Sequence, residues 1–318
     1  MDDTNTQQKS ATSRRGLLAA GAAAASAVAL TAAAAGPAQA AAGRGATGVA
    51  VPGEVGRRLA ELEREHGARL GVHARNLRTG RTVAHRADEL FPMCSVFKTV
   101  AVAAVLRDLD RDGEFLARRL HYTEADTTAS GGAPVTGLPQ NLAHGMTVGE
   151  LCAAAIDHSD NAAANLLLRE LGGPTAVTRF CRSIGDGITR LDRWEPELNT
   201  AEPDRVTDTT TPRAIARTYR RLLLGRALEP ADRRRLTGWL LGNTTSAHRF
   251  REGLPADWRL ADKTGSGSYG TANDAGVTWT PSGAPIVLVV LTTRPEPTAP
   301  RDEALVARTA SLLAATLG

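Results

Sequence analysis

Lysine is nearly absent from this chain of 318 residues. Of its 38 basic residues, only Lys9, Lys98 and Lys263 are lysines, and the rest are arginines. Arginine keeps its proton in proteins, whereas a buried lysine can lose one. Lys98 and Lys263 both fall inside the motifs described below. We therefore expect that these two positions need a compact or titratable amine.

Cysteine and aromatic residues are also scarce, and neither sign of charge is in large excess. The chain has 3 cysteines, 4% aromatic residues and a formal net charge of +4. An odd cysteine count leaves at least one thiol unpaired, and so balanced a charge does not predict binding to nucleic acid. No zinc or nucleotide motif is present, so we expect no cofactor and no metal. Six histidines show no metal-ligand spacing: His73, His85, His121, His144, His158 and His248.

The first 42 residues are typical of an export signal. Arg14 and Arg15 precede an Ala-rich, mildly apolar run, and Ala38-Gln39-Ala40 resembles a cleavage site. Paired arginines indicate twin-arginine export, and a membrane anchor is disfavoured because alanine and glycine are weakly hydrophobic. We expect a secreted mature protein, extracellular or in the cell envelope, that meets the membrane only during export and is a monomer.

Periodicity after the leader predicts helices and strands in a definite order. Strands are expected near both ends of the chain, with helices between them. This order predicts an α/β two-lobed fold, in which an antiparallel sheet built from both termini is flanked by helices and an all-α lobe is inserted. Residues 43–90 and 243–318 would form the α/β lobe and 91–242 the all-α lobe, with 127–137 as a surface loop. The expected helices are 55–66, 96–109, 146–157, 161–171, 175–184, 212–224, 229–241 and 301–317, and the expected strands are 69–75, 81–86, 258–263, 276–280 and 286–293.

The first motif that can carry chemistry is Ser95-Val96-Phe97-Lys98. A serine and a lysine three residues apart at a helix start lie on the same face. A serine hydroxyl needs a nearby base to act as a nucleophile, and a lysine with a lowered pKa is one candidate. The free N–H groups of a helix start can hold an oxyanion. The alternative is a capping serine beside a lysine whose ammonium reaches solvent.

Two further polar motifs lie at the ends of predicted elements. Ser159-Asp160-Asn161 falls between two helices, where such residues also serve as N-caps. Lys263-Thr264-Gly265-Ser266 follows a strand. Its ammonium and hydroxyls can bind a carboxylate, and Gly265 allows another backbone to lie close. The alternative for Lys263-Thr264-Gly265-Ser266 is a plain transition from a strand to a turn.

The prolines and mixed polarity of the segment 193–208 predict a compact loop with a functional role. Glu195 and Asn199 lie in its first half, between prolines and residues of mixed polarity. Arg193 and Asp208 are placed to close the loop by a salt bridge. The alternative for Glu195 is an exposed loop carboxylate.

The three motifs Ser-x-x-Lys, Ser-Asp-Asn and Lys-Thr-Gly occur here in that order, and together they resemble class A β-lactamases and penicillin-binding proteins. The resemblance runs from about Val55 to the C-terminus, and the stretch around Glu195 is similar to class A β-lactamases. It implies a β-lactam hydrolase that confers antibiotic resistance, with small-molecule β-lactams as its partners.

The resemblance also implies roles for individual residues. Ser95 would open the β-lactam ring, with the N–H groups of Ser95 and Ser266 as the oxyanion hole. Lys98 and Glu195 are both candidates for the acylation base. Ser159 would pass a proton to the lactam nitrogen. The remaining assignments place the substrate carboxylate on Lys263, Thr264, Gly265 and Ser266, the side-chain amide of the substrate on Asn161, and the hydrolytic water on Glu195 and Asn199.

The chain departs from the family pattern at several positions. Ala272 stands where many relatives carry an arginine, and Arg249 is expected to supply that guanidinium. Gly267 and Val102 occupy the places of the cysteines that pair with Cys94 and Cys152 in relatives, so no disulfide is expected. A D,D-peptidase would share the three motifs, but Glu195 with Asn199 argues against it. A non-hydrolysing β-lactam sensor would need a slow or absent attack by water, for which the sequence offers no cause. A serine esterase would not need the loop that carries Glu195 and Asn199.

Overall fold

The structure, a computed structural model, describes residues 53–318. Its centre is a five-stranded antiparallel sheet in the order β2-β1-β9-β8-β7. Strands from both ends of the described chain therefore lie side by side, as the sequence predicts. The expected leader, 1–42, lies outside the described residues. The strands are β1 (Arg69–Asn76), β2 (Thr82–His85), β7 (Arg259–Ser266), β8 (Ala272–Trp279) and β9 (Pro285–Thr293).

Strand β9 shows why helices cover both faces of the sheet. Successive side chains of a strand point to opposite faces, and nearly every residue of β9 is buried. Ile286, Leu288 and Val290 pack in one apolar cluster. Val287, Val289 and Leu291 pack in the other. A strand that is apolar on both faces must be the middle of a three-layer arrangement.

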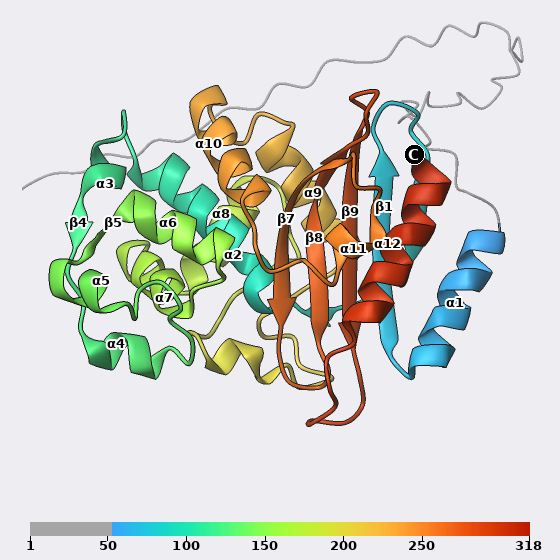
Figure 1. Cartoon of the computed structure of the whole chain (residues 1–318), viewed down its shortest axis with the longest axis horizontal. Helices are drawn as coiled ribbons and strands as arrows, with labels where there is room; N and C mark the ends of the chain where they lie inside the picture. The colour runs from blue at the N-terminus through green and yellow to red at the C-terminus, as the bar shows by residue number, and fades with distance from the viewer. Residues whose placement is uncertain (1–52) are drawn as a thin grey trace, which may run out of the picture. The chain divides into compact units, whose positions relative to one another are not determined.

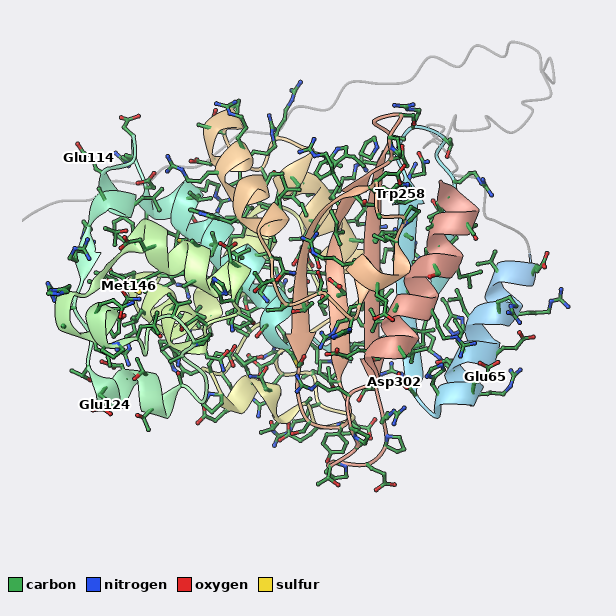
Figure 2. All side chains as sticks on the ribbon, viewed as in Figure 1. Glu65, Glu114, Glu124, Met146, Trp258 and Asp302 are labelled. Atoms are coloured by element: carbon green, nitrogen blue, oxygen red, sulfur yellow. The ribbon has the colours of Figure 1, made fainter. Side chains whose placement is uncertain are left out.

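The two helical layers come from different parts of the chain. The first face of the sheet packs against the two terminal helices (Figure 1), α1 (Glu54–His66) and α12 (Glu303–Leu317), and against the short α11 (Phe250–Gly253). Figure 2 shows Glu65 near the end of α1 and Asp302 at the start of α12 at the same end of this layer. The second face packs against α9 (Pro212–Leu223) and α10 (Pro230–Leu241).

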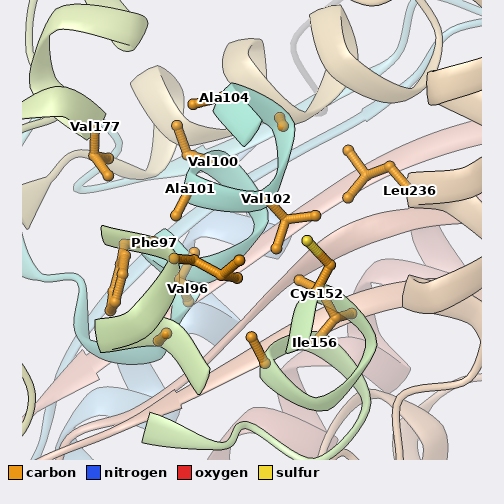
Figure 3. Packing of buried hydrophobic residues seen from close by; sticks show 14 of the residues in the cluster. Val96, Phe97, Val100, Ala101, Val102, Ala104, Cys152, Ile156, Val177 and Leu236 are labelled. Atoms are coloured by element: carbon orange, nitrogen blue, oxygen red, sulfur yellow. The ribbon is translucent and has the colours of Figure 1, made fainter. Parts of the chain in front are cut away.

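The rest of the helical lobe surrounds α2. All eight residues of α2 are buried, and Figure 3 shows Val102 beside Cys152 and Leu236, with Val177 on the opposite side of the helix. This lobe completes the two-lobed α/β fold that the sequence predicts. Its elements are η1 (Cys94–Val96), α2 (Phe97–Ala104), η2 (Val105–Leu109), α3 (Glu114–Ala117), β4 (Arg119–Leu120), α4 (Glu124–Ala129), α5 (Pro139–His144), β5 (Met146–Thr147), α6 (Val148–Asp157), α7 (Asn161–Glu170) and α8 (Thr175–Ser183).

Two short elements connect this lobe to the loop that carries Glu195. Strand β3 (Phe91–Pro92) pairs with β6 (Thr209–Thr210), which follows the loop. Within the loop, η3 (Glu197–Thr200) forms a single 3-10 turn. The loop thus leaves the helical lobe and returns beside the segment that precedes Ser95.

The structure corrects some of the predicted boundaries. The helix expected over 96–109 divides into η1, α2 and a π-helical turn, η2. Residues 146–157 begin with β5, because Thr147 and Glu150 form a capping box that starts α6 at Val148. Strand β8 begins at Ala272 rather than 276, since Ala272 pairs with Ser266 of β7.

The segment 127–137 is only partly the surface loop that the sequence predicted, since Thr128, Ala129, Gly131 and Pro134 are exposed but other residues are not. It begins inside α4, and Thr127, Ser130 and Thr136 are buried. The carboxylate of Asp160, which is fully buried, accepts hydrogen bonds from the N–H of Val135 at 2.9 Å and of Thr136 at 2.8 Å. A buried carboxylate needs such donors, and they hold the segment against α7.

Candidate active site

Ser95 lies in η1, at the entrance to α2, and is held against the sheet. The preceding residue, Cys94, has a φ of +46°, a backbone conformation that is uncommon for residues other than glycine and often found at functional sites. Asn273 of β8 donates its side-chain amide to the carbonyl of Pro92 at 2.8 Å. A Cβ on Gly265 would lie 2.8 Å from the carbonyl oxygen of Met93. Gly265 therefore allows the close backbone approach that the sequence predicted.

Lys98 is fully buried one turn beyond Ser95. Its Nζ donates to the carbonyl of Ser159 at 2.8 Å and to Oδ1 of Asn161 at 2.6 Å, and it lies 3.1 Å from Oε1 of Glu195. The Ser159 hydroxyl lies farther away, at 3.4 Å, so the three nearer acceptors suffice for the three N–H bonds of an ammonium. Burial lowers the pKa of Lys98, and the nearby carboxylate of Glu195 opposes that shift.

Glu195 is not an exposed loop carboxylate, because only 2% of the residue is accessible. Its Oε1 accepts a hydrogen bond from the Ser95 hydroxyl at 3.4 Å, and its Oε2 accepts one from the side-chain amide of Asn199. The carboxylate thus contacts both Ser95, which is expected from the sequence to open the β-lactam ring, and Asn199, which is expected to help position the hydrolytic water. A buried carboxylate between a hydroxyl and an ammonium is well placed to exchange protons with both.

The backbone of Glu195 is held by a residue that sequence reasoning missed. The side-chain amide of Asn165 donates to the carbonyl of Glu195 at 2.9 Å and accepts from its N–H at 3.0 Å. Asn165 lies four residues after Asn161 on α7, so both amides project from one helix face. That spacing is a signal from which Asn165 could have been found.

The expected salt bridge between the ends of the loop is present. Nε of Arg193 lies 2.5 Å from Oδ2 of Asp208. The other carboxylate oxygen of Asp208 accepts the N–H groups of Asp192 at 2.7 Å and of Arg193 at 3.0 Å. Asp208 is 2% exposed, so a buried and fully bonded carboxylate fixes the base of the loop.

The Ser159-Asp160-Asn161 motif serves both the helix and the site. Asp160 caps α7 by accepting the N–H of Ala163 at 2.8 Å, as the capping interpretation expects. Ser159 has a φ of +56°, and its hydroxyl lies 3.4 Å from Nζ of Lys98. Asn161 donates its side-chain amide to the carbonyl of Ser130 at 3.1 Å. The segment 127–137 therefore helps to fix the orientation of the Asn161 side chain.

Lys263 and Thr264 approach the site from β7. Lys263 is fully buried, and its Nζ donates to the carbonyl of Thr264 at 3.0 Å. Burial lowers the pKa of Lys263 to about 7, and the charge of Lys98 adds to this effect. The hydroxyls of Thr264 and Thr245 lie 2.5 Å apart. Thr245, also missed from the sequence, therefore orients the Thr264 hydroxyl.

Arg249 reaches the end of β7 from the start of α11. Its guanidinium donates to Oγ of Ser266 at 2.7 Å and to Oε1 of Glu303 at 3.0 Å. Ala272 lies opposite Ser266 in the sheet and is buried. The arginine that strand β8 lacks is thus replaced in space by Arg249, as expected from the sequence.

The three cysteines are buried and free. A Cβ on Gly267 would lie 2.8 Å from Sγ of Cys94, and Val102 lies beside Cys152 (Figure 3). Both observations agree with the positions that the sequence assigned to Gly267 and Val102.

These residues border one cavity of about 260 Å³ between the sheet and the helical lobe. Lys98, Glu195 and Lys263 lie buried beside it, within reach of its polar atoms. Within residues 53–318 there is no cluster of three or more His, Cys, Asp or Glu that could hold a metal ion, and none of the helices there could cross a membrane. The cavity is lined by Ser95, Ser159, Asn161, Asn199, Thr245, Arg249, Thr264, Gly265, Ser266, Arg301 and Glu303.

Comparison with known proteins identifies the family. Residues 54–317 match the profile described as the beta-lactamase enzyme family. The chain belongs to this family. It is 71% identical to a β-lactamase of Streptomyces lavendulae over 277 residues, which cover 86% of this chain and 91% of the relative.

Solved structures of the family agree with this assignment. The β-lactamase from Streptomyces albus G superposes with a TM-score of 0.83 at 69% identity, over 84% of this chain and all of that one. A variant of the last common ancestor of Gram-negative class A β-lactamases gives a TM-score of 0.78 at 52% identity, over 83% and 98% of the two chains. The chain is a class A serine β-lactamase by family.

Proposed function

We propose that this chain hydrolyses β-lactam antibiotics through an acyl-enzyme on Ser95, and that Glu195 serves as the base in both halves of the reaction. The observation that carries the proposal is the contact of 3.4 Å between the Ser95 hydroxyl and Oε1 of Glu195. Hydrolysis of β-lactams confers resistance on the cell, which is the activity that the names of the relatives describe.

In the acylation step, Oγ of Ser95 attacks the lactam carbonyl carbon while its proton passes to Glu195. The geometry favours Glu195 over Lys98 as acceptor, because the three N–H bonds of Lys98 already point at Ser159, Asn161 and Glu195. The N–H groups of Ser95 and Ser266 would stabilise the oxyanion. The C–N bond of the lactam then breaks, and the Ser159 hydroxyl gives its proton to the nitrogen. Lys98 lies 3.4 Å from that hydroxyl and 3.1 Å from Oε1 of Glu195. It gives a proton to Ser159 and takes from Glu195 the proton that came from Ser95, so Glu195 is a carboxylate again before deacylation.

In the deacylation step, a water molecule attacks the ester carbonyl and the ester bond to Ser95 breaks. Glu195 takes the water proton and Ser95 recovers its own. Asn199 donates to Oε2 of Glu195, so it orients the carboxylate that activates the water. Asn165 acts through the backbone of Glu195 and is a positioning residue.

Substrate recognition would use the sheet side of the cavity. Lys263, Thr264 and Ser266 offer an ammonium and two hydroxyls to the substrate carboxylate, and Arg249 orients the Ser266 hydroxyl. Gly265 keeps β7 close to Ser95, as described above. On the helical side, the amide of Asn161 would bind the side-chain amide of the substrate.

Three statements about the whole protein belong with this proposal. The proposed α/β lobe is 43–90 with 243–318, of which 43–52 lie outside the described residues, and the proposed helical lobe is 91–242, which holds only short two-residue strands and the catalytic loop 193–208. Residues 1–42 direct twin-arginine export and are removed, so the mature protein is secreted and meets the membrane only in transit. It acts as a monomer, which size-exclusion chromatography with light scattering tests. Replacing the Arg14-Arg15 pair by lysines and following secretion tests the export route.

The deciding experiment is hydrolysis of a chromogenic cephalosporin by the mature chain, with Glu195→Ala beside it and intact masses recorded. Turnover by the parent and a stalled covalent adduct on Glu195→Ala support the proposal. A parent that itself stalls as an adduct is a D,D-peptidase or a β-lactam sensor. A parent that is never labelled overturns acylation altogether.

A further inference from the structure

A second polar site lies on the sheet face that α9 only partly covers. Residues directly opposite each other in antiparallel strands point to the same face. His73 pairs with Val289 and Arg75 with Val287, and both valines belong to the cluster on the α9 face. On the neighbouring strand, Thr82 pairs with Arg75. The edge strand β2 and its neighbour β1 thus present polar side chains where the central strands present valine.

Helix α9 presents a stripe of arginines to the same place. Arg213, Arg217 and Arg220 follow one another at intervals of four and three residues, which puts them on one face of the helix. Together with His73 and Arg75 they line a cavity of about 440 Å³ that is closed at one end by the start of α1. None of the residues lining this cavity lines the catalytic one.

The positive charge of this cavity is largely uncompensated. Arg213 forms two hydrogen bonds to the carboxylate of Asp88, at 2.7 and 2.9 Å. Over residues 53–318, no carboxylate lies within 4.0 Å of Arg75, Arg217 or Arg220. Residues 43–52 contain neither aspartate nor glutamate. A concentration of like charge without counter-charge costs stability, and it attracts anions from solution.

Two buried nitrogen atoms also lack hydrogen-bond partners there. They are Nδ1 of His73 and Nε of Arg75, among the atoms of the described chain. His73 is 8% exposed. Burial, together with Arg213, Arg217 and Arg75, lowers the pKa of His73 to about 4, and Asp88 opposes this shift. Buried polar groups in proteins are usually satisfied. Nε of Arg75 can only donate, so this atom lacks an acceptor.

We propose that this cavity between α9 and the β1–β2 edge binds a phosphate-bearing anion, held by the guanidinium groups of Arg75, Arg217 and Arg220. Guanidinium groups bind phosphate oxygens in pairs and keep their charge at every pH of interest. The volume is within the range of small-ligand sites and exceeds the need of a single monovalent ion. The ligand class is therefore a compact polyvalent phosphate, such as a diphosphate or a phosphomonoester.

The first test uses inorganic pyrophosphate as the probe at constant ionic strength. We expect calorimetric binding to the full mature protein, and a Tm that rises with pyrophosphate concentration, because a ligand of the native state stabilises it. Arg217→Gln and Arg220→Gln each weaken binding about tenfold, which corresponds to the loss of one charge-assisted contact. Hydrolysis of the chromogenic cephalosporin without pyrophosphate stays unchanged in both variants.

The matched control is Arg234→Gln, which removes the same charge from an exposed position on α10. If this control weakens binding as much as Arg217→Gln does, the anion responds only to overall charge and the proposal is wrong. Absence of binding up to about 10 mM pyrophosphate at that same ionic strength overturns it as well, because a site held by three guanidinium groups should be occupied at millimolar ligand.

His73 supplies an independent readout. A bound anion beside the ring favours its protonated form, so pyrophosphate shifts the NMR titration of His73 to higher pH. Binding without any change at His73 would place the anion elsewhere and overturn the site. A second arm compares pyrophosphate with a poly(glycerol phosphate) chain in competition. Tighter binding of pyrophosphate indicates that the natural ligand is a free metabolite, and tighter binding of poly(glycerol phosphate) indicates an envelope polymer.

Discussion

The hydroxyl of Ser95 and the carboxylate of Glu195 meet at 3.4 Å although one hundred residues separate them in the chain. The contact exists because two supports converge. The sheet holds the Ser95 turn through Asn273, and α7 holds the backbone of Glu195 through Asn165. Both ends of the proton path are therefore tied to regular elements, which keeps the geometry within the tolerance that catalysis needs.

The first prediction separates the two candidate acylation bases. Glu195→Gln keeps the length of the side chain but cannot accept the Ser95 proton. We expect the rate constant of acylation, measured as the stopped-flow burst, to fall by about 10²-fold or more, the usual contribution of a general base. An unchanged burst with a stalled adduct would identify Lys98 as the acylation base and limit Glu195 to deacylation.

The second prediction concerns the pH dependence of substrate binding. The pKa of Lys263 is lowered to about 7 from an ordinary 10.5, so its ammonium is lost as the pH rises through about 7. For a substrate with a carboxylate, we expect kcat/KM, which reports the free enzyme, to fall across this range. Lys263→Arg shifts the fall to higher pH. The methyl ester of the same substrate is the control, and its kcat/KM should lack this limb.

The same shift makes a statement about stability. Between pH 7 and 10.5 the unfolded chain binds a proton at Lys263 that the folded chain does not. The free energy of unfolding therefore gains a contribution that rises with pH in this window. In Lys263→Arg this contribution disappears, because arginine stays protonated in both states. Urea unfolding of the two proteins between pH 7 and 9 measures the difference, and parallel curves would contradict the lowered pKa.

Short sequence motifs were enough to predict which groups react. Ser95 and Lys98 are one helical turn apart, and Lys263 with Gly265 ends a strand, so each pair is defined by a spacing that a motif records. The sheet order was also predictable, since strands expected near both ends had to pair. The bridge between Arg193 and Asp208 followed from opposite charges at the two ends of one loop.

Long-range packing decided what the sequence did not reveal. Asn165 of α7 bonds the backbone of Glu195, and the segment 127–137 approaches the next residue, Pro196, at Gly131. That segment looked exposed because it is rich in glycine and threonine, yet Asp160 holds it inward from another helix. His73 also gave no local signal, since its environment is set by arginines on α9 that are more than a hundred residues away.

The third prediction tests the positioning role of Asn165. In Asn165→Ala both the N–H and the C=O of Glu195 lose their partners, and each unsatisfied group costs about 1–3 kcal/mol. We expect a lower Tm and smaller rate constants for both acylation and deacylation, because Glu195 is the base in both steps. Stopped-flow kinetics and the mass of the acyl-enzyme measure the two steps separately. Asn165→Asp accepts one of the two hydrogen bonds and should be intermediate. A lower Tm with both rate constants unchanged would indicate a purely structural role.

The last prediction uses the close approach of Gly267 and Cys94. A Cβ at Gly267 would lie 2.8 Å from Sγ of Cys94, near the roughly 3 Å that a disulfide sets between a sulfur and the Cβ of its partner. Gly267→Cys should therefore form a disulfide with Cys94 on oxidation, detected as the loss of two thiols. Burial raises the pKa of the Cys94 thiol, so the bond forms slowly in the folded protein and faster during oxidative refolding.

The new side chain also affects the loop that carries Glu195. The same Cβ would lie 2.6 Å from the carbonyl oxygen of Asn199, so the Asn199 peptide must move away. Since Asn199 orients the Glu195 carboxylate, we expect deacylation to slow in both redox states of Gly267→Cys, and also in Gly267→Ala, which makes the same contact without a sulfur. Reduction with dithiothreitol should lower the Tm of Gly267→Cys alone. Deacylation at the parent rate in Gly267→Ala would show that the loop adjusts without disturbing Glu195.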